Sequence, residues 1–505
     1  MTQGRTAGEA PDLLNLSPTG RLEGTVPFSV GGRWREAASG ATFETYAPGT
    51  GRLIGRVADA GEDDLELAVE AARSVAPAWA AMAVAERAEL ITELGRRVAE
   101  NAEALGMIDA IDNGSPLTAM TADAVKGANS LKLAGLLGYE LKGHTYPISG
   151  RSLHYTTLEP WGVVARIIAF NHPTLFACAR LAPALAAGNV VILKPSELAP
   201  LGALAMAGLA SDIFPPGVLS VLTGGPGLGR AIAAHPVIRR LSFTGSVATG
   251  LAVMRETAES GVIKSVTYEL GGKNPIIVFP DADLDAAARA VVRGMNFTRV
   301  QGQSCGSTSR LLVHRDVHRQ VVDLVVELAG AIRIGLPTDP ATEMGSLINI
   351  GSQERCTRMV GAAVGEGARL VLGGTPPADP ELEGGAYFLP TVLDDVPVGA
   401  EVSREEVFGP VLSVTPWSSE DEAIDQANAL RFGLTASVWT ADIDAALRSV
   451  QRLEAGYIWV NDVETRYLTV PFGGWKDSGA GLEQGLDEVL SFTRMKSVNV
   501  TIAPQ

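Results

Sequence analysis

Five short apolar runs, separated by segments of helical length, constrain this chain more than any other feature of its sequence. The runs are Val163 to Phe170, Asn189 to Leu193, Leu219 to Leu222, Arg240 to Phe243 and Lys264 to Leu270. Strands that alternate with helices in this way predict a parallel sheet wound with right-handed crossovers. Such a sheet binds ligands at the carboxyl ends of its strands, where loops meet helix N-termini. Functional residues are therefore expected directly after these runs.

A second α/β series begins at Asn274-Pro275-Ile276-Ile277-Val278 and continues to about Asn461. The sequence thus predicts two doubly wound α/β domains joined near Gly271-Gly272. Ahead of them, apolar residues recur at helical spacing, and we expect several packed helices over 60–135, the first capped by Asp63 or Asp64. Residues 1–24, which are polar with Gly and Pro, predict a poorly ordered lead-in.

Composition excludes several classes of function. Among 505 residues, 41 Lys and Arg face 57 Asp and Glu, so the formal net charge is −16 and nucleic acid is not an expected partner. No run of about 20 apolar residues predicts a membrane span, and Met1 to Leu14 has no apolar core of a secretory signal. Three scattered cysteines make neither a disulfide framework nor a zinc motif. We expect a cytoplasmic protein.

Cys305 is a candidate nucleophile, in Gln301-Gly302-Gln303-Ser304-Cys305-Gly306-Ser307. Its small neighbours let a substrate approach the sulfur. We expect it between a strand and a helix, where a helix N-terminus would lower the thiol pKa. The alternative is a buried, inert cysteine, which is also how we interpret Cys178 and Cys356.

Glu269 ends an apolar strand and is followed by two glycines, at the ligand edge of the sheet. A carboxylate there can act as a general base on water if burial raises its pKa. The alternative is an ion pair with a nearby Lys such as Lys273. Asn171 follows another strand, and its amide can face a developing oxyanion, although Asn after a strand is usually a turn residue.

Other strand ends carry nucleotide-like features. Lys194-Pro195-Ser196-Glu197 places two opposite charges where a ribose could bind, and Phe243-Thr244-Gly245-Ser246 opens a helix whose N–H groups could meet a phosphate. The glycines at 224, 225, 227 and 229 are a weak phosphate-loop signal, because their spacing is not GxGxxG. His314 and His318 are four residues apart without a third ligand, so we interpret them as histidines of a surface helix and predict no metal.

Taken in order, these motifs resemble those of the NAD(P)-dependent aldehyde dehydrogenase superfamily. The series comprises Asn171, Lys194-Pro195-Ser196-Glu197, Phe243-Thr244-Gly245-Ser246, Glu269-Leu270-Gly271-Gly272-Lys273, Gly302-Gln303-Ser304-Cys305, Glu406-Val407-Phe408-Gly409-Pro410 and Pro471-Phe472-Gly473-Gly474. The resemblance runs from about residue 30 to the C-terminus. It implies an NAD-binding domain over 25–142 and 162–270, a catalytic domain over 271–470, and an oligomerisation arm from 143–161 and 485–505. A homodimer or homotetramer would follow, with the β-prone tail from Ser497 to Thr501 pairing with another subunit.

By this resemblance Cys305 attacks the aldehyde, Asn171 with the Cys305 backbone N–H stabilises the oxyanion, and Glu269 activates the water that hydrolyses the thioester. Glu269 also argues against relatives that transfer the acyl group to coenzyme A. Lys194 and Glu197 would hold the adenosine ribose, and Glu197 favours NAD, with NADP also possible. The further cofactor residues implied are Ile168, Phe170, Ser196, Gly225, Gly229, Phe243, Thr244, Gly245, Ser246, Leu270, Glu406 and Phe408.

The positions that the resemblance places along the substrate tunnel are polar and cationic. They are His172, Ala179, Arg299, Ser304, Arg466 and Phe472. Because Arg binds carboxylate or phosphate through two parallel hydrogen bonds, we hypothesise an aldehyde with an anionic or strongly polar far end, such as a semialdehyde. The alternative is that Arg299 or Arg466 pairs with an acid such as Glu464 or points into a subunit interface.

Two other functions stay open at this point. One is a cysteine-dependent ester or thioester hydrolase without redox chemistry, although no His stands in a convincing motif beside Cys305. The other is a non-catalytic binding protein on the same fold, against which the presence of both Cys305 and Glu269 argues.

Overall fold

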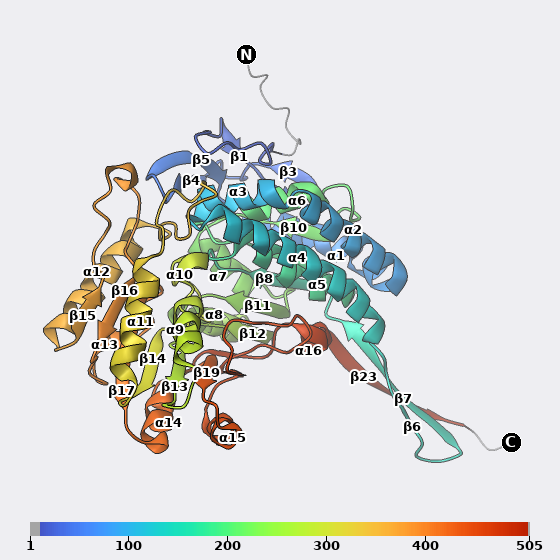
Figure 1. The fold of residues 1–505 in the computed structure, drawn as a ribbon. Helices are drawn as coiled ribbons and strands as arrows, with labels where there is room; N and C mark the ends of the chain where they lie inside the picture. The colour runs from blue at the N-terminus through green and yellow to red at the C-terminus, as the bar shows by residue number, and fades with distance from the viewer. Residues whose placement is uncertain (1–10, 503–505) are drawn as a thin grey trace.

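The computed structural model describes residues 11–502, which form two wound α/β units and a three-stranded arm that projects away from them (Figure 1). This confirms the predicted fold class. In Figure 1 the blue and teal helices lie beside the green first sheet, and the yellow and orange strands of the second sheet lie to the left. None of the helices in 11–502 combines the length and apolar character that crossing a bilayer requires.

The first sheet has eight strands in the order β22-β12-β11-β8-β9-β10-β2-β3. Its five central strands are parallel and correspond to the five predicted runs: β8 (Val163–Ile167), β9 (Val190–Lys194), β10 (Leu219–Val221), β11 (Arg240–Thr244) and β12 (Ser265–Glu269). Antiparallel strands close the two edges, with β2 (Phe28–Val30) and β3 (Arg33–Arg35) on one side and β22 (Gly479–Ala480) on the other. The sheet therefore takes one edge strand from the far end of the chain.

Helices of the first unit pack around this sheet, as the apolar spacing over 60–135 predicts. They are α1 (Glu62–Ala81), α2 (Val84–Glu100), α3 (Ala102–Asn113), α4 (Leu117–Leu137), α5 (Pro173–Ala186), α6 (Leu201–Ala210), α7 (Pro226–Ala234) and α8 (Val247–Glu259). The cap of α1 differs from the prediction: Gly61 precedes the helix, and Asp64, inside its first turn, accepts the Gly61 N–H at 2.9 Å.

Part of the predicted lead-in contributes to the core of the first unit. Residues 1–10 lie outside the described residues, but Leu13 and Leu16 are buried in the core of the first unit. Two leucines with helical or turn spacing are enough to anchor a polar segment, because each buries apolar area that the chain would otherwise expose. Beside them lies a small sheet of β1 (Thr25–Val26), β4 (Thr42–Ala47) and β5 (Arg52–Ala58).

The second sheet has seven strands in the order β15-β16-β17-β14-β13-β19-β20, all parallel except for β15. The strands are β13 (Pro275–Val278), β14 (Arg310–His314), β15 (Arg369–Leu372), β16 (Thr391–Asp394), β17 (Val411–Trp417), β19 (Thr435–Trp439) and β20 (Tyr457–Val460). Its helices are α9 (Leu284–Gly294), α10 (Phe297–Val300), α11 (His318–Gly330), α12 (Ile350–Gly365), α13 (Glu401–Arg404), α14 (Glu420–Asn428) and α15 (Ile443–Arg452). A short antiparallel ladder pairs β18 (Phe432–Gly433), which precedes β19, with β21 (Trp475–Lys476), which follows β20.

The arm joins two segments that are more than 300 residues apart in sequence. Strand β23 (Thr493–Thr501) pairs antiparallel with β7 (Ser152–Pro160), which also pairs with β6 (Thr145–Tyr146). The tail predicted to pair with another subunit thus pairs with β7 of its own chain, and β23 is an edge strand of the sheet. Helix α16 (Gly485–Ser491) precedes β23 and contacts α4 and α5.

Candidate active site

A cavity of about 860 Å³ runs along the carboxyl ends of β8, β9, β11 and β12. It is lined by nearly every residue that the sequence assigns to the cofactor, namely Ile168, Phe170, Lys194, Ser196, Glu197, Gly229, Phe243, Thr244, Gly245, Ser246, Leu270, Glu406 and Phe408. Gly225 is the exception. It lies just before α7, outside this lining, and its N–H donates to Asp59 at 3.2 Å. We call this cavity the nucleotide cleft.

Charged groups in the nucleotide cleft are held by local contacts. Lys194 Nζ donates to Pro195 O at 3.2 Å and to Glu197 Oε2 at 3.4 Å, so the two opposite charges predicted at this loop do pair. Burial lowers the pKa of Lys194. Glu406 accepts the Gly272 N–H at 3.1 Å, and burial raises the pKa of its carboxyl to about 7. The Ser246 hydroxyl accepts the Thr249 N–H and caps α8.

Several residues that line this cleft are absent from the sequence prediction, and Arg355 is one of them. Arg355, on α12, lines the cavity, and its guanidinium donates to Val407 O at 3.0 Å and to Phe408 O at 3.4 Å. It therefore fixes the backbone that carries Glu406 and Phe408. A lone Arg on a helix carries no motif, and the contact spans about 50 residues of sequence, so no sequence signal indicates it.

Cys305 lies in the loop between α10 and β14, and the expected order of strand before and helix after is wrong. No helix begins directly after Cys305, and the expected lowering of its pKa is also wrong. Burial raises the pKa of Cys305 to about 11, although the neighbouring charge of Arg466 acts in the opposite direction. Cys305 is half-buried, whereas Cys178 and Cys356 are fully buried. Among the three cysteines it is the accessible one.

Glu269 and Asn171 line the nucleotide cleft together with Cys305. Glu269 is 3% exposed, and neither of its carboxylate oxygens has a hydrogen-bond partner among the described residues. Desolvation raises its pKa well above the usual value, with the negative charge of Glu483 adding to the effect. The alternative ion pair with Lys273 does not form, since the Lys273 Nζ is itself without a partner among these residues. Asn171 Nδ2 donates to Gln303 O, in the Cys305 loop, at 2.9 Å.

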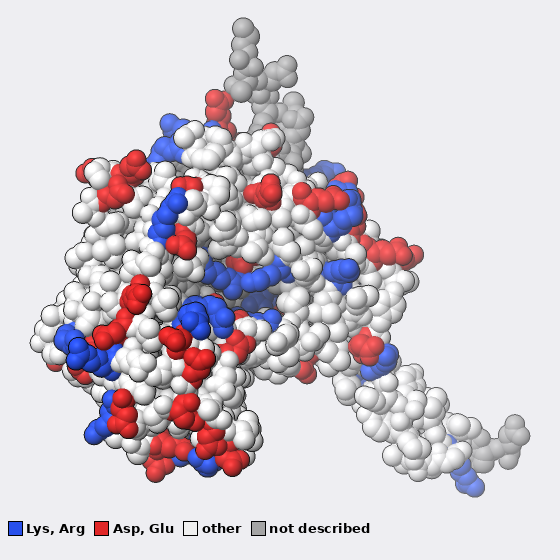
Figure 2. All heavy atoms as spheres, viewed as in Figure 1, with Lys and Arg blue, Asp and Glu red and all other residues white. Residues whose placement is uncertain are grey.

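A second cavity of about 200 Å³ reaches Cys305 from another side. Five of the six predicted tunnel residues line it: His172, Ala179, Arg299, Ser304 and Arg466. Phe472 lies outside the lining and is buried under Arg466, whose Cζ is 4.1 Å from the centre of its ring. Lys and Arg side chains gather in the hollow at the middle of the face shown in Figure 2. We call this cavity the substrate cavity.

Asp123, on α4, neutralises part of that positive charge. It is fully buried and contacts both Arg299 Nη2 and His172 Nδ1 at 2.5 Å. Arg299 thus pairs with an acid, as the alternative interpretation expected, but with Asp123 and not Glu464. Burial alone would raise the pKa of Asp123, but the contacts with His172 and Arg299 lower it. A carboxylate in the apolar stripe of α4, beside Met120 and Ala124, is the sequence signal that could have indicated this pair.

Two further buried ion pairs lie next to the substrate cavity, and sequence reasoning missed both. Arg180 pairs with Glu483, and Arg166 pairs with Glu488 at 2.7 Å. The acids come from the segment 483–488, about 300 residues after their partners. Burial raises the pKa of Glu483 to about 7, although Arg180 acts against that change. These pairs connect the C-terminal segment to the first unit.

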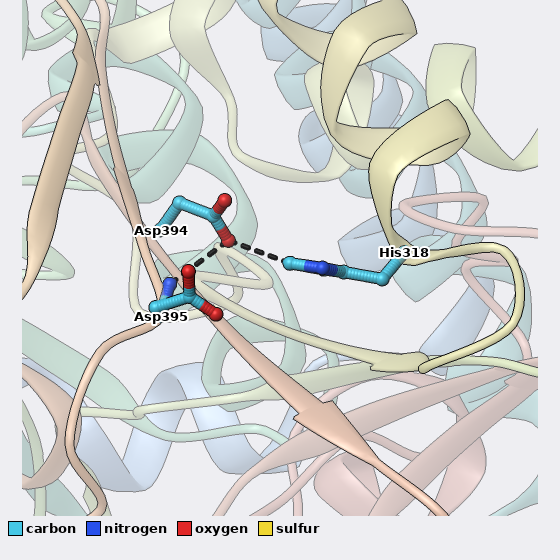
Figure 3. Close-up of side chains that lie close together, drawn as sticks. All are labelled: His318, Asp394 and Asp395. Carbon is cyan, nitrogen blue, oxygen red and sulfur yellow. Dashed lines mark hydrogen bonds and ion pairs between the residues drawn. The ribbon is translucent and has the colours of Figure 1, made fainter.

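The two histidines considered as metal ligands do not share a helix. His314 ends β14, whereas His318 begins α11, so the expected four-residue helical spacing is not formed. His318 Nε2 lies 2.7 Å from Asp394 Oδ1, with Asp395 beside it (Figure 3). Arg369 also pairs with the buried carboxylate of Asp394. The charge of this acid is already balanced by side chains of the protein.

Comparison with known proteins gives one consistent result. A sequence model described as the aldehyde dehydrogenase family matches residues 34–498. The aldehyde dehydrogenase tropH of Talaromyces stipitatus is 44% identical over 479 residues, which are 93% of this chain and 92% of that protein. An aldehyde dehydrogenase of Bacillus cereus, solved with NAD+, is 37% identical with a TM-score of 0.92 over 99% of this chain and 100% of that one. A variant of the indole-3-acetaldehyde dehydrogenase AldA of P. syringae, solved with NAD+ and IAA, is 37% identical with a TM-score of 0.91, over 96% and 97%.

Proposed function

The chain belongs to the aldehyde dehydrogenase family, and we propose that it oxidises an anionic aldehyde to the carboxylic acid, with NAD as the electron acceptor. One observation carries the proposal: Cys305 lines both the nucleotide cleft and the substrate cavity, and Glu269 and Asn171 line the cleft together with it. A nucleophile, a candidate base and a candidate oxyanion donor therefore meet where two ligands would meet.

The nucleotide cleft suits NAD in size and in the placement of its polar groups. The carboxylates of Glu197 and Glu406 can accept hydrogen bonds from ribose hydroxyls, and the N-terminus of α8 can face a phosphate. Phe170 and Phe408 pack edge to face, with ring centroids 5.8 Å apart, next to Asn171. The charge of Glu197 disfavours a 2′-phosphate, so NAD is preferred over NADP.

Covalent catalysis begins at Cys305. Its thiolate attacks the aldehyde carbon, and the resulting oxyanion accepts hydrogen bonds from the Cys305 N–H and from Asn171. The Asn171 amide has a second N–H besides the one given to Gln303 O, so it can donate to the oxyanion without losing its place. Bound NAD supplies the acceptor for the hydride of this adduct, and an acyl thioester on Cys305 results.

Glu269 completes the cycle as the general base. Its buried carboxylate is without a protein partner, which leaves both oxygens available to a water molecule. Deprotonation of that water lets it add to the thioester carbonyl, and the thiolate of Cys305 leaves as the acid forms. The raised pKa of Glu269 makes its carboxylate a stronger base than a solvated one.

The charge of the substrate cavity supports an anionic substrate. Lys126, Arg180, Arg299 and Arg466 line it beside Glu464 and Glu488. Of these four cations, only Arg180 and Arg299 form ion pairs among the described residues, with Glu483 and Asp123. An aldehyde with a carboxylate, such as a semialdehyde, would complete this balance, and a cationic aldehyde would be repelled. Of the three relatives reported above, only the indole-3-acetaldehyde dehydrogenase of P. syringae has a particular aldehyde in its name, so the charge of this cavity is the guide to the substrate here.

We also propose that the arm joins this chain to a second copy, as a homodimer or homotetramer. Strand β23 is an edge strand, and apolar side chains of the arm are exposed, among them Ile148 (72%) and Met495 (62%). The edge strand of a second copy could pair with β23, and the exposed apolar side chains could be buried against that copy.

The decisive test is NADH formation, measured by absorbance with purified protein, NAD and a panel of aldehydes, beside Cys305→Ala. We expect a signal in the wild type that is lost in the variant while NAD binding, measured by calorimetry, is kept. No signal with any aldehyde would contradict the proposal. Ester hydrolysis without NAD would then favour the cysteine hydrolase, and its absence would favour a binding protein.

A further inference from the structure

Arg466 is the one arginine lining the substrate cavity that forms no ion pair among residues 11–502, although the half-buried carboxylate of Glu464 lines the same cavity and acts on its charge. Arg299 pairs with Asp123 and Arg180 pairs with Glu483, but no carboxylate lies within 4.0 Å of the Arg466 guanidinium in the described chain. Its planar group stacks on Phe472, and its edges stay free to donate. Stacking on a buried ring orients the guanidinium before a ligand arrives, which lowers the entropic cost of binding.

Gly306, directly after Cys305, makes room for this guanidinium. A Cβ atom at position 306 would lie 2.2 Å from Arg466 Nη2, well inside contact distance. The backbone of Gly306 does not have the positive φ that favours glycine, so any residue could adopt its conformation. A larger residue at this position would therefore act mainly by shifting the end of the Arg466 side chain.

We propose that Gly306 and Arg466 act as a pair that determines substrate specificity, with Arg466 binding a carboxylate close to the reacting carbon. This inference rests on the proposed dehydrogenase function and deepens it. Because the guanidinium lies against the residue next to the nucleophile, the bound carboxylate is a few atoms away from the aldehyde carbon. The anionic group thus belongs near the aldehyde and not at the far end of a long chain, which narrows the proposed substrate class.

The chemistry of the pair defines the substrate class. Short ω-oxo acids can place a carboxylate on Arg466 while their aldehyde carbon reaches Cys305, and a cavity of about 200 Å³ holds molecules of that size. When the aldehyde carbon of a long ω-oxo acid is at Cys305, its carboxylate lies too far away to bind Arg466. Arg is suited to this role because it binds a carboxylate through two parallel hydrogen bonds, which also fixes the orientation of the substrate.

The test compares kcat/KM for 4-oxobutanoate with kcat/KM for butanal, and kcat/KM for 8-oxooctanoate with that for octanal. The ratio within each pair cancels changes in the thiolate itself, because both members react with the same nucleophile. We expect the wild type to prefer 4-oxobutanoate over butanal and to show a smaller preference in the longer pair. Arg466→Met should lower the first ratio about 10- to 100-fold, the range for a hydrogen bond to a charged group.

Gly306→Ala should lower that ratio about tenfold by displacing the guanidinium. In the Arg466→Met background, however, the same change should alter the ratio less than twofold, because the displaced group is gone. Gly361→Ala is the control, since its added methyl on α12 meets open space. Melting temperature and NAD binding, measured for each variant, report whether the fold is kept.

Three results would overturn the inference while leaving the dehydrogenase in place. These are equal wild-type kcat/KM for 4-oxobutanoate and butanal, an unchanged ratio in Arg466→Met, or an undiminished effect of Gly306→Ala in the Arg466→Met background. Absence of NADH formation with every aldehyde would instead refute the dehydrogenase function and the inference together.

Discussion

The nucleotide cleft and the substrate cavity meet at one cysteine but are built differently. The cleft is lined by strand ends of one parallel sheet, by the loops and helices that follow those strands, and by segments of the second unit such as α12. The substrate cavity is assembled from side chains of α4, α5, α10, α16 and the loop around Arg466. Two of its arginines form ion pairs, Arg299 with Asp123 and Arg180 with Glu483. Topology thus places the groups that face a common cofactor, and packing of individual side chains sets the charge that faces the substrate.

The largest expected effect tests Glu269, which lines the nucleotide cleft together with Cys305. Glu269→Gln removes the base but keeps the volume, so the steady-state rate should fall about 10²- to 10⁴-fold. A burst of NADH equal to the enzyme concentration should persist, because formation of the thioester does not need this base. Rapid-mixing absorbance measures the burst. A burst lost together with turnover would place Glu269 in the earlier steps.

The pH dependence sharpens the same point. The carboxylate of Glu269 is its active form, and its pKa is raised by burial, so a growing fraction becomes active as the pH rises. Below that pKa, kcat should increase about tenfold per pH unit if hydrolysis of the thioester limits the rate. Steady-state rates between pH 5.5 and 9 measure this slope. A rate that falls with increasing pH would contradict the assignment.

A change confined to the nucleotide cleft should leave the substrate cavity unaffected. Glu197→Gln removes the charge that opposes a 2′-phosphate, and kcat/KM for NADP relative to NAD should rise about tenfold. The ratio of kcat/KM for 4-oxobutanoate to that for butanal should stay constant. Initial rates with each cofactor measure both quantities. A shift in the aldehyde preference would show that the two regions are coupled through more than Cys305.

The smallest expected effect changes the charge of the substrate cavity without touching Arg466. Asp123→Asn removes the carboxylate that compensates Arg299 and binds His172. One uncompensated positive charge is worth about 1 kcal/mol at 4 Å in water, so preference for the anionic aldehyde should rise about fivefold. Kinetics with 4-oxobutanoate and butanal measure it, with melting temperature as the control for folding. A decreased preference would show that Asp123 positions Arg299 more than it neutralises it.

Much of the nucleotide cleft was predictable because strand ends leave a local signature. Glu269 and Asn171 lie at the ends of apolar runs, and both line the same cavity as Cys305. The misses depend on contacts between distant segments. The thiol of Cys305 is buried where a helix N-terminus was expected, and Gly225 lies outside the cleft because α7 turns it towards Asp59. Leu13 and Leu16 are anchored by a core that the local composition does not reveal.

The sequence by itself determined the fold class, the family and the identity of the groups at the ends of the central strands. These follow from periodicity and from motifs that are contiguous in the chain. Only the tertiary structure decided which charges in the substrate cavity are balanced. Asp123 is 176 residues from Arg299, and Gly306 is 160 residues from Arg466, so neither pair has a local signal. Whether a buried charge is compensated depends on which side chains lie within a few ångströms, and that distance is set by packing.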